Sequence, residues 1–391
     1  MQAFIRFIIL FISFSLISAC GGGGGGSEPP PPPQKKYTYQ PPANLNDGWT
    51  ISHLEDLQID VARMEAFMDG VKDGTYSGID AVAIARNGQL GFYELTRSTF
   101  DQFDPFVNNT NLSVHILHSS TKSFISALVG IAHEEGFLPD LDASMIDYFD
   151  YGPYENWDDR KRDITIRNTL TMQLGLQWDE WSSPYGSSEN SLSKLYANAP
   201  FYTRALFNLP MAADPGTTYV YNTGASMALG ELVERAVGMR LEDYAELKLF
   251  EPMQITEAKW EVLLNSIPNT GGGLFLNARS MVKFGQLYLD DGVWNGQQIL
   301  TPEWVADSLA RAVLLNWDNT SGYGYQWWLG EFISQGRQYE FYSTRGYGGQ
   351  FIFVVPELEL VVAFQARNYG NDTLYALPFQ LMEDHILPAI N

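Results

Sequence analysis

Cysteine is almost absent from this sequence: Cys20 is the single cysteine among 391 residues. An internal disulfide needs two cysteines and a thiolate zinc site needs several, so the chain can form neither. Basic residues are also few, because 24 Lys and Arg stand against 46 Asp and Glu, giving a formal net charge of -22. A protein of this charge repels phosphate backbones and anionic lipid headgroups. We therefore expect no nucleic-acid partner and no charge-driven membrane binding.

Two other patterns found in many hydrolases and metalloenzymes are missing. The sequence contains no G-x-S-x-G, the nucleophile motif of α/β-hydrolases with a Ser-His-Asp triad, so that class is disfavoured. His115 and His118, two of the five histidines, lie at helical spacing, but no carboxylate-bearing zinc motif accompanies them. We expect both histidines to be structural, and we expect neither a metal ion nor a cofactor.

The first twenty residues have the pattern of an export signal. Arg6 precedes an apolar run at residues 7–17, and small residues then lead to Cys20. The run is shorter than the roughly 20 residues that a membrane-spanning helix needs. Residues 17–20 resemble the lipobox of bacterial lipoproteins. The resemblance implies that residues 1–19 are a lipoprotein signal peptide and that Cys20 is lipidated; secretion without a lipid is the alternative.

A tether is expected next, at residues 20–46. Six glycines (residues 21–26) and five prolines (residues 29–33) dominate its first half, and such a composition cannot pack a core. A glycine directly after the lipidated cysteine is similar to proteobacterial lipoproteins of the outer membrane. The resemblance implies a cell-envelope location, on the periplasmic or the surface side, with the lipid as the contact to the membrane.

The remaining residues, 47–391, are interpreted as one catalytic domain. The middle of this domain, about residues 119–253, has helical periodicity, whereas β-prone runs lie towards both ends. These pieces predict an α/β (α+β) fold in which an antiparallel sheet forms from both chain ends and encloses a mainly helical insert. The β-prone runs are two at residues 80–95 around the turn sequence Asn87-Gly88, and one each at residues 323–329, 351–355 and 358–364.

Ser119 and Lys122 form a Ser-x-x-Lys sequence at the start of an amphipathic helix. Residues three apart share a helix face, so the lysine amine can reach the serine hydroxyl. A free lysine, with a pKa near 10.4, is a poor base at neutral pH, and burial has to lower that pKa by roughly three units. Ser-x-x-Lys also occurs at residues 191–194 and 280–283, but only the first begins a long apolar helix.

The order of several motifs resembles the β-lactamase-related serine hydrolases. This superfamily includes class C β-lactamases, D-alanyl-D-alanine carboxypeptidases, family VIII-type esterases and 6-aminohexanoate-dimer hydrolases, and the resemblance implies the serine β-lactamase/transpeptidase-like fold. It also implies that Tyr221 exchanges protons with the nucleophile and the leaving group, helped by Lys122; Tyr219 is the rival residue. The matching segments, besides Ser119–Lys122, are residues 169–176, 215–224, 271–285, 294–300 and 323–328. The match at residues 271–285 places Lys283 on a helix, where we expect it at the surface.

A third motif, Lys-Thr-Gly or His-Thr-Gly in many relatives, falls at Thr344, Arg345 and Gly346. The resemblance implies that a backbone N–H there forms an oxyanion hole with the N–H of Ser119. Thr344 and Arg345 replace the usual lysine and threonine, and Thr223 stands where β-lactamases usually carry asparagine. Both changes alter the groups that bind a β-lactam, although an arginine can still bind a carboxylate.

The resulting hypothesis is a serine hydrolase that acts through an acyl-enzyme on a small-molecule ester or linear amide. The alternatives are a penicillin-recognising enzyme and a non-hydrolytic binding lipoprotein that keeps the fold. Whether Lys122 or Tyr221 is the base is left open. Five aromatic residues line either the substrate pocket or the core: Trp178, Trp181, Tyr185, Trp327 and Trp328.

Overall fold

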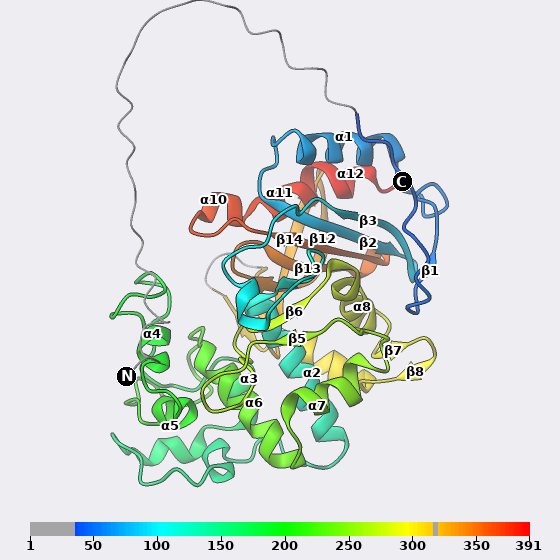
Figure 1. Ribbon diagram of the computed structural model, residues 1–391. Helices are drawn as coiled ribbons and strands as arrows, with labels where there is room; N and C mark the ends of the chain where they lie inside the picture. Colours follow the sequence, from blue (N-terminus) through cyan, green and yellow to red (C-terminus); the bar gives the residue numbers. More distant parts are fainter. Residues whose placement is uncertain (1–35, 316–319) are drawn as a thin grey trace, which may run out of the picture. The chain divides into compact units, whose positions relative to one another are not determined.

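The computed structural model describes residues 36–315 and 320–391. The expected signal peptide and Cys20 lie outside the described residues. Residues 36–391 form one compact unit (Figure 1). Within the described part of the chain, no helix has both the length and the hydropathy that crossing a bilayer requires.

A nine-stranded sheet is the centre of this unit, in the order β1-β3-β2-β14-β13-β12-β11-β10-β9. Strands from the two chain ends meet where β2 pairs with β14, which confirms the predicted sheet. β1 pairs with β3 in parallel, so the sheet is mixed rather than purely antiparallel. Its strands are β1 (Thr50–Ile51), β2 (Ile79–Arg86), β3 (Gln89–Leu95), β9 (Val313–Leu314), β10 (Gly322–Tyr323), β11 (Trp328–Ser334), β12 (Arg337–Gly346), β13 (Gln350–Val355) and β14 (Leu360–Ala366).

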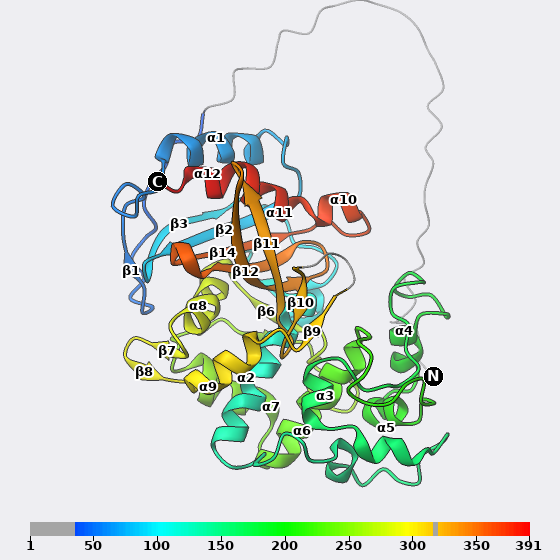
Figure 2. The ribbon, with the colours of Figure 1, turned by 180° about the vertical axis from the view of Figure 1, so that it is seen from behind.

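Turn residues explain where these strands begin and end. Asn87 and Gly88, both with positive φ, connect β2 to β3 as the sequence predicts. The single strand expected at residues 323–329 is wrong, because the chain turns between β10 and β11. Gln326 has φ 63° in this turn, and Gly324 N–H bonds to the Trp327 carbonyl across it. β9, β10 and β11 close this end of the sheet, as seen from behind in Figure 2.

Helices cover both faces of the sheet (Figures 1 and 2). α1, α11 and α12 lie on one face, and α8 and α2 lie on the other. Alternate residues of β2 supply both layers: Ala83 faces α2 and α8, whereas Val82 and Ile84 face α1. The helices are α1 (Val61–Lys72), α2 (Thr121–Glu134), α3 (Ile166–Leu170), α4 (Ser191–Tyr196), α5 (Tyr202–Phe207), α6 (Thr223–Val237), α7 (Leu241–Ala245), α8 (Ala278–Leu289), α9 (Pro302–Leu309), α10 (Asp372–Tyr375), α11 (Leu377–Leu381) and α12 (Leu387–Ala389).

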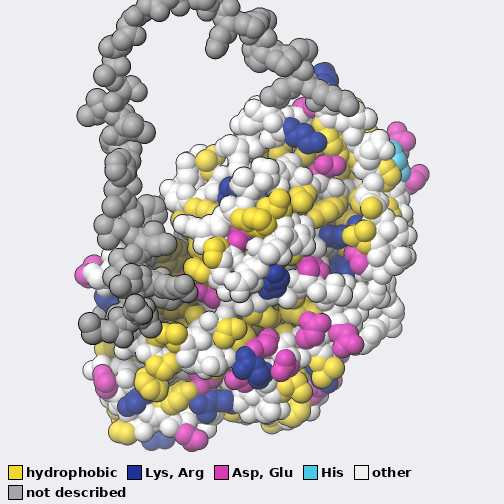
Figure 3. Space-filling view, viewed as in Figure 1, with side chains coloured by type: hydrophobic (Ala, Val, Ile, Leu, Met, Phe, Trp, Pro, Cys, Tyr) yellow, Lys and Arg dark blue, Asp and Glu magenta, His cyan; other side chains and the backbone are white. Residues whose placement is uncertain are grey.

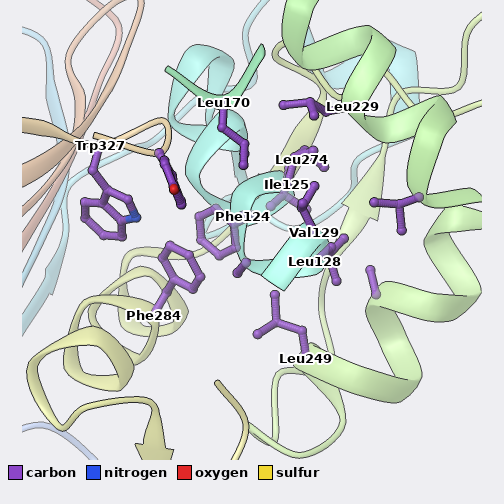
Figure 4. Packing of buried hydrophobic residues seen from close by; sticks show 14 of the residues in the cluster. Phe124, Ile125, Leu128, Val129, Leu170, Leu229, Leu249, Leu274, Phe284 and Trp327 are labelled. Atoms are coloured by element: carbon purple, nitrogen blue, oxygen red, sulfur yellow. The ribbon is translucent and has the colours of Figure 1, made fainter. Parts of the chain in front are cut away.

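The predicted helical insert contains α2 to α7, and no strand is assigned between residues 117 and 258 of this described stretch. α2 is the central helix, and nearly all of its residues are buried. Figure 4 shows Phe124, Leu128 and Val129 of α2 packed among side chains of α3, α6 and α8. Two short sheets complete the fold: β4 (His115–Ile116), β5 (Lys259–Trp260) and β6 (Leu274–Leu276) form one, and β7 (Val293–Trp294) and β8 (Gln297–Gln298) form the other.

The compact unit begins at Lys36, earlier than the boundary at residue 47 that composition suggested. Tyr39 is 4% exposed; its hydroxyl donates to the Gly91 carbonyl at 2.8 Å and accepts from Leu54 N–H at 3.2 Å. Tyr37 is buried as well and donates its hydroxyl to Glu94. Residues 36–46 therefore belong to the folded domain rather than to a tether.

Replacing Tyr39 should destabilise the whole domain, because its ring is buried and both of its hydrogen bonds join separate segments. We expect Tyr39→Ala to lower the free energy of unfolding by about 3 kcal/mol in urea denaturation. Leu45→Ala is the matched control, since Leu45 lies in the same segment but is 61% exposed. An unchanged midpoint for Tyr39→Ala would show that this segment does not contribute to the fold.

Candidate active site

Ser119 lies at the point where the chain passes from β4 into α2. A short 3₁₀ helix, His118–Ser120, connects them, and His118 has φ 46°, a left-handed conformation that is uncommon for a residue with a side chain. Ser119 is partly exposed, whereas Ser120 is buried. The backbone therefore presents the Ser119 side chain at the end of a rigid, buried helix.

Lys122 follows one helical turn later and is 2% exposed. Its amine donates to the Ser119 hydroxyl at 2.9 Å and to the Gly271 carbonyl at 2.6 Å. Burial lowers the pKa of Lys122 to about 8, against a smaller opposing effect of the Glu180 charge. A substantial share of this amine is thus neutral near pH 8 and able to accept a proton from Ser119.

Tyr221 lies two residues before α6 and close to the Lys122 amine. The Lys122 amine is 5.2 Å from the centre of its ring, and the ring stacks on Trp181 at 5.1 Å. Burial raises the pKa of Tyr221 well above its usual range; the Glu180 charge adds to this, and a hydrogen bond with Ser119 partly offsets it. The rival, Tyr219, packs on Tyr323 and Trp328, and its buried hydroxyl has no hydrogen-bond partner in the part of the chain that the structure describes.

The predicted oxyanion motif forms the end of β12. β11 pairs with β12 only as far as Ser343, so among the described residues one edge of β12 has no strand partner over Thr344–Gly346. This edge meets the 3₁₀ helix of Ser119: a Cβ on Gly346 would lie 2.1 Å from the Leu117 carbonyl oxygen. Only glycine permits so close an approach.

The side chains beside Gly346 do not both face the site. Thr344 donates its hydroxyl to the Ser120 hydroxyl at 3.1 Å and accepts from Ile352 N–H, so it joins β12 and β13 to the start of α2. The Arg345 guanidinium lies 4.8 Å over the Trp328 ring and 4.9 Å over the Phe379 ring. Thr344 therefore makes a structural contact with Ser120, and its contact with substrate stays a prediction.

Thr223, expected to contact substrate, is bound to a residue that the sequence analysis missed. Its backbone N–H and its hydroxyl donate to the two carboxylate oxygens of Glu180 at 2.8 and 2.5 Å. Glu180 also accepts from Trp178 Nε1 at 3.1 Å and from the Tyr185 hydroxyl at 3.2 Å. The available signal was an acidic residue within an aromatic stretch; Trp178 and Tyr185 are local partners, but Thr223 lies 43 residues away in sequence.

The two other Ser-x-x-Lys sequences lie elsewhere. Lys194 on α4 is 57% exposed and pairs with Glu189 at 4.0 Å. Lys283 on α8 was expected on a helix surface, which is wrong: it is buried, and its amine donates to the carbonyls of Met253 and Gln254. Within the part of the chain that the structure describes, neither lysine forms a hydrogen bond with the serine of its own motif, in contrast to Lys122.

The aromatic residues divide between pocket and core. Trp181 and Tyr185 are 54% and 46% exposed. The rings of Trp181 and Trp328 lie against the ring of Tyr221, and Tyr185 packs edge-on against Tyr347. Trp178 is buried against Glu180. Trp327 is wholly buried against Phe284 and Tyr288, in the cluster that Figure 4 shows. Trp181, Tyr185 and Trp328 are therefore candidates for the wall of a substrate site.

The histidines near the serine have structural surroundings. His115 Nε2 lies 3.3 Å from carboxylate oxygens of Asp80 and Asp101. His118 packs edge-on against Phe103 at 4.6 Å, and burial lowers its pKa to about 3, so it is neutral at physiological pH. No group of three or more His, Cys, Asp or Glu among residues 36–315 and 320–391 has the arrangement of a metal site.

A family model described as Beta-lactamase matches residues 65–377, which include the whole of this site. The chain belongs to the beta-lactamase family. Among solved structures, this beta-lactamase-family chain is similar to a putative 6-aminohexanoate-dimer hydrolase from Bacillus anthracis, with a TM-score of 0.64 and 19% identity, covering 88% of this chain and 84% of that one. The likeness confirms the predicted serine β-lactamase/transpeptidase-like fold.

Curated relatives match over shorter stretches. Acyltransferase mokF from Monascus pilosus is 25% identical over 229 residues, which are 54% of this chain and 54% of that protein. The 6-aminohexanoate-dimer hydrolase of Paenarthrobacter ureafaciens is 24% identical over 276 residues, 63% of this chain and 64% of that protein. The chain thus spans less than two thirds of the length of either relative.

The proximity of Lys122 to Ser119 predicts how the reactivity of the serine depends on pH. Lys122 can accept a proton only when its amine is neutral, so fluorophosphonate labelling of Ser119 should speed up as pH rises, with a midpoint near 8. Lys122→Met should slow labelling at least about 100-fold. Lys194→Met removes the exposed lysine of another Ser-x-x-Lys sequence and should change nothing. A labelling rate that does not vary with pH would exclude Lys122 as the base.

Proposed function

We propose that the chain is a serine hydrolase that forms an acyl-enzyme from carboxylic esters or linear amides. The observation that carries this proposal is the 2.9 Å hydrogen bond between the Lys122 amine and the Ser119 hydroxyl, in a position where burial lowers the lysine pKa to about 8. A serine next to a base of this kind is an activated nucleophile. The names of the similar proteins, an acyltransferase and a dimer hydrolase, support acyl transfer.

The proposed reaction begins with attack of the Ser119 oxygen on the substrate carbonyl carbon. Lys122 takes the serine proton, because its pKa is near neutrality whereas that of Tyr221 is far above it. The negative carbonyl oxygen is bound by the N–H of Ser119 and an N–H at the open end of β12; such donors typically contribute about 10² to 10³ in rate each.

Tyr221 then protonates the leaving group and is reprotonated from Lys122. Its high pKa keeps the phenol protonated before this step, which suits a proton donor. A water molecule attacks the acyl-enzyme in the second half of the reaction, again with Lys122 as the base, and Ser119 is regenerated. Lys122 thus accepts the proton of the attacking group in both halves, first from Ser119 and then from water, and in the second half it returns that proton to the Ser119 oxygen.

The preference for esters and linear amides over β-lactams rests on two substituted positions. Thr223 gives its hydroxyl to Glu180, so it does not present the amide that an asparagine would present. Thr344 is bound to Ser120. The exposed rings of Trp181 and Tyr185 favour an apolar acyl group next to Ser119.

We also propose that the protein is a lipoprotein of the cell envelope. The glycine that follows Cys20 favours the outer membrane as its location. The support is the sequence at residues 17–20 and the glycine and proline composition that follows it. The scattered single Lys and Arg side chains on the face shown in Figure 3 agree with a lipid, rather than basic residues, as the contact to the membrane.

Labelling with two probes tests the proposed activity. The full-length chain should react with a fluorophosphonate, and Ser119→Ala should abolish the reaction. Ser191→Ala and Ser280→Ala, the serines of the two other Ser-x-x-Lys sequences, are matched controls and should label normally. Labelling by a fluorescent penicillin would instead favour a penicillin-recognising enzyme. A folded wild type that neither probe labels would favour the binding lipoprotein and overturn the proposal.

Metabolic incorporation tests the proposed anchor. Cells that express the chain and are fed an alkyne fatty acid should yield a labelled protein in the membrane fraction. Cys20→Ser should remove both the label and the membrane association, while Ser18→Thr, two residues earlier, should retain them. A wild type that stays unlabelled and leaves the cell would indicate secretion without a lipid.

A further inference from the structure

Glu180 is a carboxylate placed inside the wall of the site. It is 3% exposed and accepts hydrogen bonds from Thr223 N–H, the Thr223 hydroxyl, Trp178 Nε1 and the Tyr185 hydroxyl. Four donors satisfy a buried carboxylate and leave it little capacity for a substrate. Glu180 is therefore suited to act on the site through its neighbours and its charge.

Its neighbours include the residues that hold Tyr221. Trp181, next in the chain, stacks on the Tyr221 ring with the planes 19° apart. Thr223, two residues after Tyr221, begins α6 and gives its N–H to Glu180. A carboxylate at this helix start also interacts favourably with the positive end of the helix dipole. Glu180 thus lies next to the residue that stacks on the Tyr221 ring and holds the start of the helix that follows Tyr221.

Glu180 is also connected to Lys122 through Tyr221, because the Lys122 amine lies 5.2 Å from the centre of the ring on which Trp181 stacks. The Lys122 amine donates to a hydroxyl and a carbonyl, and no ion pair with a carboxylate is recorded for it among the described residues. Glu180 is the charged group that opposes the effect of burial on the pKa of Lys122, and it also contributes to the raised pKa of Tyr221. The same carboxylate acts on both proton-transfer groups.

We propose that Glu180 is the positioning residue of this site: its carboxylate fixes the start of α6 and the Trp181–Tyr221 stack, and its charge keeps Lys122 able to hold a proton between transfers. The inference rests on the proposed acyl transfer. Burial alone favours a permanently neutral amine, which could accept the serine proton but would return it poorly to the leaving group. The nearby negative charge of Glu180 counteracts this effect of burial on the Lys122 amine.

The test is the pH dependence of kcat/KM for p-nitrophenyl butyrate with the full-length chain. Glu180→Gln keeps the size of the side chain but removes the charge, so the pKa of Lys122 falls. The acidic limb of the pH profile, where activity is lost as Lys122 becomes protonated, should then move to lower pH by about one pH unit. Glu180→Asp retains the charge and should keep the limb near its wild-type position, even if activity falls. Glu261→Gln is the matched control.

Glu261 suits this purpose because its carboxylate accepts from Asn269 at 2.7 Å and is not among the charges that act on Lys122. An acidic limb that stays in place in Glu180→Gln, or moves equally in Glu261→Gln, would overturn the role of Glu180. Should Glu180→Gln fail to fold, Thr223→Val is the second variant, because it removes only the hydroxyl donor to the carboxylate. An unchanged kcat for Thr223→Val would then overturn the proposed role of Glu180. Failure of the proposed function looks different, because wild-type Ser119 would not react at all.

Discussion

The burial of the Lys122 amine is the constraint on which the site depends. A lysine in water is charged at neutral pH and cannot serve as a base, whereas this amine lies under the apolar packing of α2 with a carbonyl and a hydroxyl as partners. Gly271 can supply that carbonyl because its loop lies tightly against α6, where a Cβ would be 2.5 Å from Thr223. The ability of Lys122 to accept a proton therefore depends on the hydrophobic packing that buries its amine.

The parts of the site that are local in sequence could be predicted. Ser119 and Lys122 are one helical turn apart, so their contact follows from helix geometry. Tyr221 was identified from the order of the motifs in the family resemblance, with Tyr219 left as the rival residue. The face of the sheet to which the Thr344 side chain points could not be predicted. It depends on the register of β12 against β13, and a shift of one residue would move the side chain to the other face.

The errors in the fold prediction have a common physical origin. Composition placed residues 36–46 in a tether, yet Tyr39 is held by partners in two distant segments, Gly91 and Leu54. Lys283 matched the pattern of a surface residue but is buried beside Asp47, with two carbonyls as acceptors. Local patterns report the periodicity of a helix or strand, and they do not report which distant groups will satisfy a polar atom.

The register of the sheet determines whether β12 can contribute to the site. β11 ends its pairing at Ser343 because the chain turns away at residues 324–327, and this leaves the backbone of the last three residues of β12 open on one edge. Gly346 then brings that edge against Leu117, two residues before the nucleophile. Had β11 continued as the single strand that the sequence suggested, its pairing would have occupied the N–H groups that the proposed oxyanion hole requires. The break in the strand is thus a condition for the acyl transfer that we propose at Ser119.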